Sequence, residues 1–419
     1  MWLSLTTPRE RRTLLAGFLG YGLDSFDFMI YTFIIPTLLG VWGMSNAQAG
    51  YIASGALVTS SIGGWGAGVL ADRFGRVRVL QWTVVWFALF TFLSGFTQSY
   101  GELLVTRALQ GFGFGGEWAV GSVLVAETID ARHRGKAAGL VQSSWAVGWA
   151  IAALAYWGAY AAAPPATAWR ILFWLGIAPA LLVVYLRRSV RESDLFQSSR
   201  RARPLHRDRS AEAGSAAARS AALDIFRGPV LRTTLWASAL CCGMMGAYYS
   251  VTTWLPTYLG EERHLSVMGT SGYLLVLIAG SFCGYLAGAW LSDALGRRRC
   301  FMLYAACGAL LVTVYTYAPL TDEVMLVLGF PLGFFLSGIF SGMGAFLAEL
   351  YPNAIRGSGQ GFCYSLGRAV GALFPALIGA WSARSSLGAG IGAMTAAGYA
   401  LVVAAAWALP ETRGRALAE

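Results

Sequence analysis

The stretch Gly20–Pro36, GYGLDSFDFMIYTFIIP, places Asp24 and Asp27 inside a run that otherwise has the composition of a membrane-spanning helix. A helix that begins near Leu14 reaches Asp24 after about 15 Å, which is roughly the midplane of a hydrocarbon core about 30 Å thick. Their spacing of three puts both carboxylates on one helix face. Because an ionised carboxylate at this depth is costly, such groups line aqueous cavities, pair with cations or carry protons. The stretch therefore predicts a proton-binding pair, with a purely structural pin between helices as the alternative.

The composition is that of a polytopic membrane protein. Of the 419 residues, 56% are hydrophobic and only 12% are charged, which lies outside the range of soluble globular domains. Apolar segments of spanning length predict an all-helical protein with twelve spans. These spans are expected near residues 14–39, 49–70, 79–97, 102–126, 137–159, 169–187, 231–259, 268–292, 300–319, 323–350, 357–382 and 388–409.

The distribution of basic residues predicts the orientation. With a cytoplasmic N-terminus, the external loops hold only Arg170, Arg263 and Arg384, whereas the cytoplasmic segments hold the other loop arginines and Lys136. The positive-inside rule therefore favours an inner-membrane protein with both termini cytoplasmic and no cleavable signal peptide. The net charge of +10 is explained by topology and lipid headgroups, so we expect no nucleic-acid partner.

The chain repeats itself after about 220 residues. Asp72–Arg78, DRFGRVR, recurs as Asp293–Arg299, DALGRRR, at an offset of 221. Ala126-Glu127 recurs as Ala348-Glu349 at an offset of 222. Because six spans separate the copies, both halves have the same orientation in the membrane. We expect a six-helix half over residues 1–187, a basic cytoplasmic linker over 188–230 and a second six-helix half over 231–419.

These motifs resemble those of the major facilitator superfamily. The resemblance rests on GVLADRFGRVR, on Arg107–Glu117 (RALQGFGFGGE) and on the terminal LPETRG, and it covers nearly the whole chain. Within the superfamily, LDSFDF, GGEW and AELYPNAIRGSGQGFCYSLGR are similar to the organic-acid:proton symporters, which include sialate, lactate and aromatic-acid carriers. The resemblance implies inward transport of a carboxylate together with protons.

Three further charges are expected inside the spans. Arg368 lies at about the depth of Asp24, where a guanidinium needs an anion and matches a carboxylate bidentately. A structural pair between Arg368 and Asp24 or Asp27 is the alternative. Glu117 follows a glycine-rich run and is a third candidate proton carrier. Arg107 is left open between a substrate contact and a scaffold role.

Aromatic and amide side chains near the midplane are predicted to line the substrate site. Interfacial aromatic belts are the competing explanation for many of them. No histidine falls inside a span, so the proton carrier is expected to be a carboxylate. The candidate lining residues are Tyr21, Tyr31, Gln142, Trp145, Tyr248, Tyr249 and Tyr364.

Charged residues at the cytoplasmic ends of the spans are predicted to form gating ion pairs. The positive-inside rule explains why arginines lie in these cytoplasmic loops, but it does not explain why the acidic residues recur in both halves. The second copy of the loop motif lacks an arginine directly after its aspartate. The ion pairs at the second loop are therefore expected to differ from those at the first. The candidates are Asp72, Arg73, Arg76, Arg78, Glu127, Arg134, Asp293, Arg297, Glu349 and Arg356.

The sequence thus predicts a monomeric carrier that moves a small organic monocarboxylate (aromatic, lactate-like or sialate-like) with protons by alternating access of its two halves. A di- or tricarboxylate symporter, a drug:proton antiporter and a non-transporting nutrient sensor are the alternatives. The six cysteines fall in or at the ends of apolar spans, and we expect them to pack rather than to form disulfides. No nucleophile with a base and no metal-ligand spacing is present, so we expect no enzyme activity, cofactor or metal.

Overall fold

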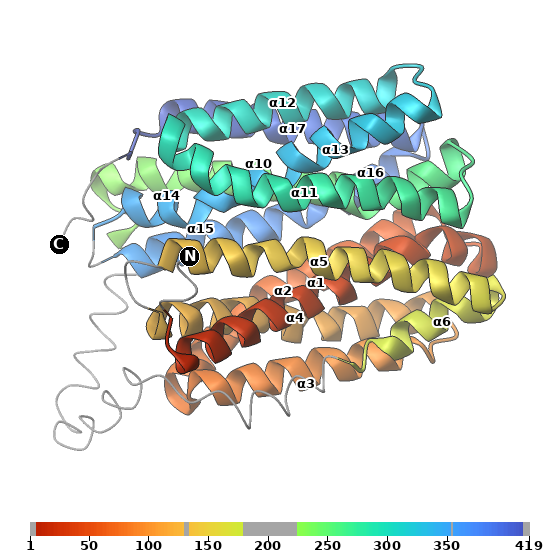
Figure 1. Ribbon diagram of the computed structural model, residues 1–419, viewed down its shortest axis with the longest axis horizontal. Coiled ribbons are helices and arrows are strands. Elements are labelled where there is room, and N and C mark those ends of the chain that lie inside the picture. The colour runs from red at the N-terminus through yellow and green to blue at the C-terminus, as the bar shows by residue number, and fades with distance from the viewer. Residues whose placement is uncertain (1–5, 130–133, 179–223, 353–354, 414–419) are drawn as a thin grey trace.

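The computed structural model describes residues 6–129, 134–178, 224–352 and 355–413. In these residues the chain is entirely helical apart from short connections, as predicted. Figure 1 shows the helices running nearly parallel along the long axis of the molecule. They are α1 (Pro8–Trp42), α2 (Asn46–Phe74), α3 (Arg76–Ser94), α4 (Tyr100–Thr128), α5 (Arg134–Ala162), α6 (Pro165–Leu175), α10 (Gly228–Thr257), η4 (Tyr258–Glu262), α11 (Val267–Leu295), α12 (Arg297–Tyr317), α13 (Asp322–Gly338), η5 (Ile339–Gly342), α14 (Met343–Leu350), α15 (Arg356–Gly371), α16 (Leu373–Trp381) and α17 (Leu387–Ala408).

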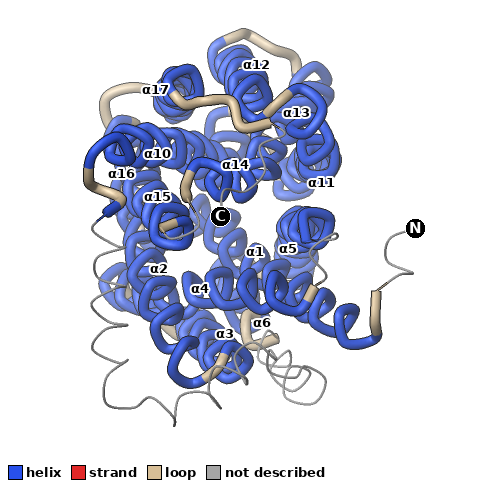
Figure 2. The backbone as a smooth tube through the Cα atoms, turned by 90° about the vertical axis from the view of Figure 1, so that its left-hand side faces the viewer, coloured by secondary structure: helices blue, strands red, loops and turns tan. Residues whose placement is uncertain are grey.

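The helices form two groups that follow the predicted halves. In Figure 2, helices α1 to α6 lie below and helices α10 to α17 lie above. The halves meet where α2 lies against α15 and α16, where α5 lies against α11, and where α1 lies against α10. Most of the predicted linker 188–230 lies outside the described residues, and α10 begins at Gly228.

Most helices begin differently at the two ends of the bundle; α1, which Thr7 and Glu10 cap in a capping box, is an exception. We call the end where α1 begins and α17 ends the terminal end, and the opposite end the far end (Figure 1). At the terminal end, Gly75 and Gly296 alone join α2 to α3 and α11 to α12, with φ angles of 105° and 95° that favour glycine. This requirement explains the glycine of the repeated loop motif. At the far end, serine and threonine side chains cap helix N-termini, as Ser45 does with Gln48 in a capping box.

Two spans that were predicted to be continuous are interrupted. The predicted span 323–350 consists of α13, the 3₁₀ turn η5 and α14. The predicted span 357–382 breaks at Ala372 between α15 and α16. Pro375 has no N–H for the carbonyl of Gly371 four residues earlier, which explains this second break. The break lies one turn after Arg368.

Close backbone contacts fix the position of α4 along its axis relative to α2. Gly115 packs directly against the backbone carbonyl of Ser60 on α2, and in the other half Gly333 packs in the same way against Leu277. A side chain at either glycine would collide with the facing helix. Small residues of this kind let membrane helices approach closely and so hold neighbouring side chains in one register. Among the described residues, seven helices are also long and apolar enough to cross a membrane on hydropathy alone.

Candidate functional site

Asp27 on α1 is surrounded by hydrogen-bond donors. It accepts from the hydroxyl of Thr91 on α3 and from the amide of Gln110 on α4. An Arg107 guanidinium nitrogen, also on α4, lies 3.5 Å from its carboxylate. Both charged side chains are buried, and the Arg107 guanidinium also lies over the rings of Tyr31 and Phe173 at 5.6 Å. Asp27 therefore belongs to a compact, largely satisfied polar cluster within the first half.

Asp24 has a different environment, although it lies only one turn away on α1. It is completely buried, and neither of its carboxyl oxygens accepts a hydrogen bond from an N–H or O–H group of the described chain. Its neighbour is the carboxyl group of Glu117 on α4, within hydrogen-bonding reach. Two carboxyl groups can share a hydrogen bond only if one of them holds a proton. The Asp24–Glu117 pair is therefore chemically suited to bind a proton.

Arg368 on α15 reaches the same region from the second half. Its side chain is only 5% exposed, and no acid of the described chain forms an ion pair with it. The guanidinium instead lies over the rings of Phe114 at 5.0 Å and Tyr364 at 5.9 Å, and it faces the hydroxyl of Tyr249. Its charge acts on both Asp24 and Glu117 across the gap. This is a buried cation without a carboxylate partner beside a buried acid pair.

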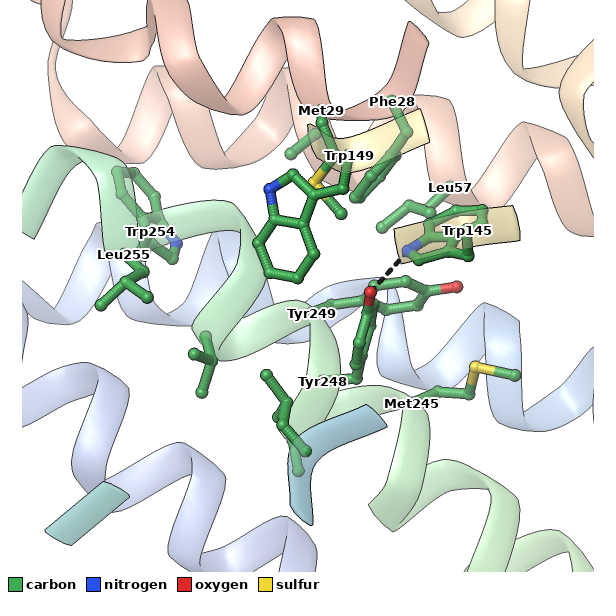
Figure 3. Packing of buried hydrophobic residues seen from close by; sticks show 14 of the residues in the cluster. Phe28, Met29, Leu57, Trp145, Trp149, Met245, Tyr248, Tyr249, Trp254 and Leu255 are labelled. Carbon is green, nitrogen blue, oxygen red and sulfur yellow. Dashed lines mark hydrogen bonds between the residues drawn. The ribbon is translucent and has the colours of Figure 1, made fainter. Parts of the chain in front are cut away.

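Aromatic side chains from both halves surround these charges. The indole N–H of Trp145 on α5 donates to the hydroxyl of Tyr248 on α10 at 2.6 Å, which links the two halves (Figure 3). Tyr21 packs on Trp145 with ring centroids 5.0 Å apart, and Phe28 lies 6.0 Å from Tyr249. The charges therefore lie beside a wall of flat rings that belongs to both halves.

Polar groups extend this wall. The amide of Gln142 donates to the hydroxyl of Tyr21 at 3.0 Å. Tyr285 on α11 faces both Gln142 and Tyr248. Sequence reasoning did not select Tyr285, because neither its position nor its repeat equivalent carried a signal. Phe114 was also missed, although its position one turn before Glu117 on the same helix face offered a usable signal.

The predicted lining residues thus divide into two groups. Tyr21, Gln142, Trp145, Tyr248, Tyr249 and Tyr364 gather around Arg368 and the Asp24–Glu117 pair. Tyr31 lies with Arg107 instead, and its hydroxyl donates to the backbone carbonyl of Ala49 at 2.8 Å. Tyr31 and Arg107 therefore belong to the Asp27 cluster.

At the terminal end, the second half carries a charge cluster built on Arg297. Its guanidinium pairs with Asp293 on α11 and, at 3.1 Å, with Glu349 on α14. Glu349 also accepts from Thr412, and Glu411 accepts from the backbone N–H of Arg297 at 2.9 Å. The residue directly after Asp293 is not basic, and Arg297 one turn later supplies the basic partner of Asp293 instead. These contacts all lie within the second half.

The equivalent groups of the first half are only partly described. The guanidinium of Arg76 donates to the carbonyl of Ala71 at 3.1 Å, Arg73 lies over the ring of Phe74, and Arg78 is exposed. Arg356 in the second half donates to the carbonyl of Ala348 at 3.0 Å. The side chains of the remaining gating candidates, Asp72, Glu127 and Arg134, lie outside the described part of the structure.

At the far end, α2 and α16 form a seam between the halves. The amide of Asn46 donates to the hydroxyl of Ser382 at 3.0 Å, and the backbone N–H of Ala376 donates to Ser54 at 3.2 Å. At the far end the two halves are therefore in direct contact along α2 and α16. Two predicted external arginines have structural partners here: Arg170 donates to the carbonyls of Gly95 and Thr97, and Arg263 donates to that of Leu320.

Within the described ranges, no group of three or more His, Cys, Asp or Glu side chains is arranged to hold a metal ion. The six cysteines are all free thiols. What the described residues do define is a bundle of long, largely apolar helices in two groups, with buried charged groups where the groups meet.

The comparison with known families agrees with this architecture. The model of the Major Facilitator Superfamily matches residues 17–375, and the chain therefore belongs to that superfamily. The fold is that of the proton:xylose symporter XylE of E. coli bound to 6-bromo-6-deoxy-D-glucose, with a TM-score of 0.74, 20% identity and coverage of 98% of both chains. The predicted family and the predicted helical fold are thus confirmed.

Two curated relatives are more similar in sequence. The chain is 39% identical over 416 residues to the probable 4-methylmuconolactone transporter of Cupriavidus pinatubonensis, covering 99% of this chain and 94% of the relative. It is 30% identical over 386 residues to the cis,cis-muconate transport protein of Acinetobacter baylyi, covering 91% and 90%. The protein is accordingly a multi-pass membrane transporter of this superfamily and not an enzyme.

Proposed function

We propose that the protein is a proton-coupled symporter that imports a small organic monocarboxylate by alternating access. The observation that carries the proposal is the buried Arg368, whose guanidinium has no acid partner in the described chain. A buried cation is stable only when an anion or an aromatic face compensates it, and its planar fork matches a carboxylate. In this proposal the substrate carboxylate binds Arg368, and the surrounding rings contact the remainder of the substrate.

The proton is carried by the Asp24–Glu117 pair. Asp27 is already neutralised by Arg107 and two neutral donors, so its role in the proposal is to hold α1 against α4. Arg368 acts electrostatically on both acids of the pair. When a substrate carboxylate binds Arg368 and neutralises it, the pair gains affinity for a proton, so anion and proton travel together.

The membrane orientation follows from the arginine distribution. We infer that the terminal end is cytoplasmic and that the protein lies in the inner membrane as a monomer. The closed seam at the far end then corresponds to an inward-facing or occluded state. The terminal-end charges, including the Arg297–Glu349 pair, hold the helices of the second half together beside the cytoplasmic gate.

The names of the relatives support an organic acid of modest size. The lactone of 4-methylmuconate has one carboxylate beside an unsaturated ring, whereas cis,cis-muconate has two carboxylates. Of the two buried arginines described, only Arg368 has no acid partner among the described residues, and one available cation favours a monoanion over a polycarboxylate. It is also of the wrong sign for the cationic substrates of a drug antiporter. A sensor without transport is distinguished by uptake into liposomes.

The test is a thermal-shift screen of the purified protein against 4-methylmuconolactone, cis,cis-muconate, benzoate and lactate, followed by uptake into proteoliposomes. A ligand that binds the folded state raises the melting temperature. We expect Arg368→Lys to weaken binding by about tenfold or more, because an ammonium cannot reproduce the bidentate fork. Arg170→Lys, a far-end arginine that bonds to backbone carbonyls, is the control and should bind normally. Unchanged binding in Arg368→Lys would remove Arg368 from the substrate site.

A further inference from the structure

Phe114 occupies a position that the proposed transport cycle does not yet explain. It is a buried residue of α4, three positions before Glu117 and therefore on the same helix face. The Arg368 guanidinium lies 5.0 Å from the centre of its ring. Phe28 of α1 stacks on Phe114 with an interplanar angle of 16° and so fixes its orientation. A residue of the first half thus holds the charged group of the second half.

The guanidinium has an obvious alternative partner. Asp24 and Glu117 both lie within electrostatic reach of Arg368, yet neither forms an ion pair with it. In a site of low dielectric, direct contact between these charges would be strongly favoured. That contact would occupy the substrate's cation and lower the affinity of the two acids for a proton. The site would then be blocked for both the anion and the proton.

We infer that Phe114 is a positioning residue that keeps the Arg368 guanidinium apart from the Asp24–Glu117 pair in the empty site. The inference rests on the proposed function. The aromatic ring compensates the cation through its quadrupole, which attracts more weakly than a carboxylate does. A substrate carboxylate can therefore displace Arg368 from the ring, whereas an internal ion pair would compete with the substrate. The ring thus leaves the cation available while it keeps the acid pair able to hold a proton.

The other groups around the guanidinium do not replace this function. Tyr364 on α15 lies 5.9 Å away on the same helix as Arg368, and Tyr249 on α10 faces it with its hydroxyl. Both belong to the second half, as Arg368 does. Tyr21 of α1 contributes a neutral hydroxyl, and the charges of Asp27 and Arg107 are paired with each other. Tyr21 shares α1 with Asp24, but the first-half ring that the guanidinium lies over is that of Phe114, on the same helix as Glu117.

The first experiment needs no substrate. Infrared spectra of the purified full-length protein near neutral pH should contain the carbonyl band of a protonated carboxyl group, assigned by its loss in Asp24→Asn or Glu117→Gln. In Phe114→Leu the band should disappear, because the guanidinium then contacts the pair. Phe114→Tyr keeps the ring and should keep the band. Phe33→Leu, a buried phenylalanine that stacks on Tyr156 away from Arg368, is the control for loss of an aromatic core residue.

The second experiment measures binding of 4-methylmuconolactone by calorimetry. Phe114→Leu should bind it about tenfold more weakly, within the usual range for coupled sites, and Phe114→Tyr should restore the affinity. In an Asp24→Asn/Glu117→Gln background the same Phe114→Leu change should weaken binding of the lactone by less than about twofold. The reason is that neither acid of the pair remains to capture Arg368.

The outcomes separate the two proposals. A Phe114→Leu protein that retains both the carboxyl band and the affinity overturns the role of Phe114. So does a wild-type protein without the band, or an undiminished binding loss in the doubly neutral background. If the Arg368→Lys variant binds the acid as well as the wild type does, the proposed function fails, but the infrared result still decides whether Phe114 separates the charges.

Discussion

At the scale of single residues, two aspartates one turn apart have opposite environments. Asp27 accepts bonds from Thr91 and Gln110 and lies beside Arg107, whereas no N–H or O–H group of the described chain donates to Asp24, which lies next to the carboxyl group of Glu117. Donors and a cation stabilise the ionised form of a carboxyl group, and a neighbouring carboxyl favours a shared proton. The same residue type on one helix face can therefore serve structure at one position and proton binding at the other.

This difference predicts distinct phenotypes for the two asparagine variants. Asp24→Asn mimics a protonated acid, so it should lose accumulation against a gradient while it retains substrate counterflow. Asp27→Asn leaves the buried Arg107 without its counter-charge and should destabilise the protein by about 3–5 kcal/mol. Counterflow in proteoliposomes and melting temperature in detergent measure the two effects. If Asp24→Asn still accumulates substrate, the proton is carried elsewhere.

At the scale of helices, the far-end seam depends on two glycines. A Cβ atom at Gly50 of α2 would lie 2.6 Å from the carbonyl oxygen of Pro375, and Gly379 packs against the carbonyl of Asn46. The two helices touch through backbone, and this contact allows Ser54 and Asn46 to bond to the other half. The seam also adjoins the α15–α16 break beside Arg368.

A larger side chain at Gly50 should therefore hold the far end open. In Gly50→Val, a cysteine introduced as Ser54→Cys should react with a membrane-impermeant maleimide several times faster than in the Ser54→Cys parent. Gly68→Val is the matched control, because a Cβ at Gly68 on the same helix meets nothing within 4 Å. Equal labelling rates in the Gly50→Val and Gly68→Val proteins would show that the seam does not gate access.

At the scale of the whole molecule, the scaffold is symmetric and the charges are not. The single-glycine turns at Gly75 and Gly296 and the close glycine contacts recur in both halves. The acids of the candidate site lie on α1 and α4, whereas its arginine lies on α15. Rocking of two similar halves thus brings an anion-binding group and a proton-binding pair together across one interface.

The arrangement predicts how uptake depends on pH. If anion binding promotes protonation, protonation must strengthen anion binding by the same factor, so the apparent affinity should improve as pH falls. One proton per monoanion is electroneutral, whereas a second proton would add about 2.3 kcal/mol per 100 mV of membrane potential. Proteoliposome uptake with separately imposed pH gradients and potassium–valinomycin potentials measures both. An affinity that does not change with pH would contradict coupling through this site.

Much of the architecture follows from the sequence alone. Hydrophobic length and arginine placement predict spans and orientation, and the repeated loop motif predicts two equivalent halves. A glycine is needed at Gly75 and Gly296 because one residue must turn the chain with a positive φ. The depth of Asp24 and Arg368 follows from helix rise, since 1.5 Å per residue converts sequence position directly into distance along the membrane normal. Properties that depend only on local sequence, or on position along one helix, can therefore be predicted from the sequence.

Contacts between helices were decided only by the tertiary structure. Position along a span does not determine how each helix is rotated against its neighbours, and helices that are apolar nearly all round give little indication of it. The pairing of Asp27 with Arg107, the placement of Phe114 over Arg368, the inward position of Tyr285 and the α2–α16 seam all depend on that rotation. Close packing at the glycines sets it, because backbone contacts leave each helix only one register in which its side chains fit.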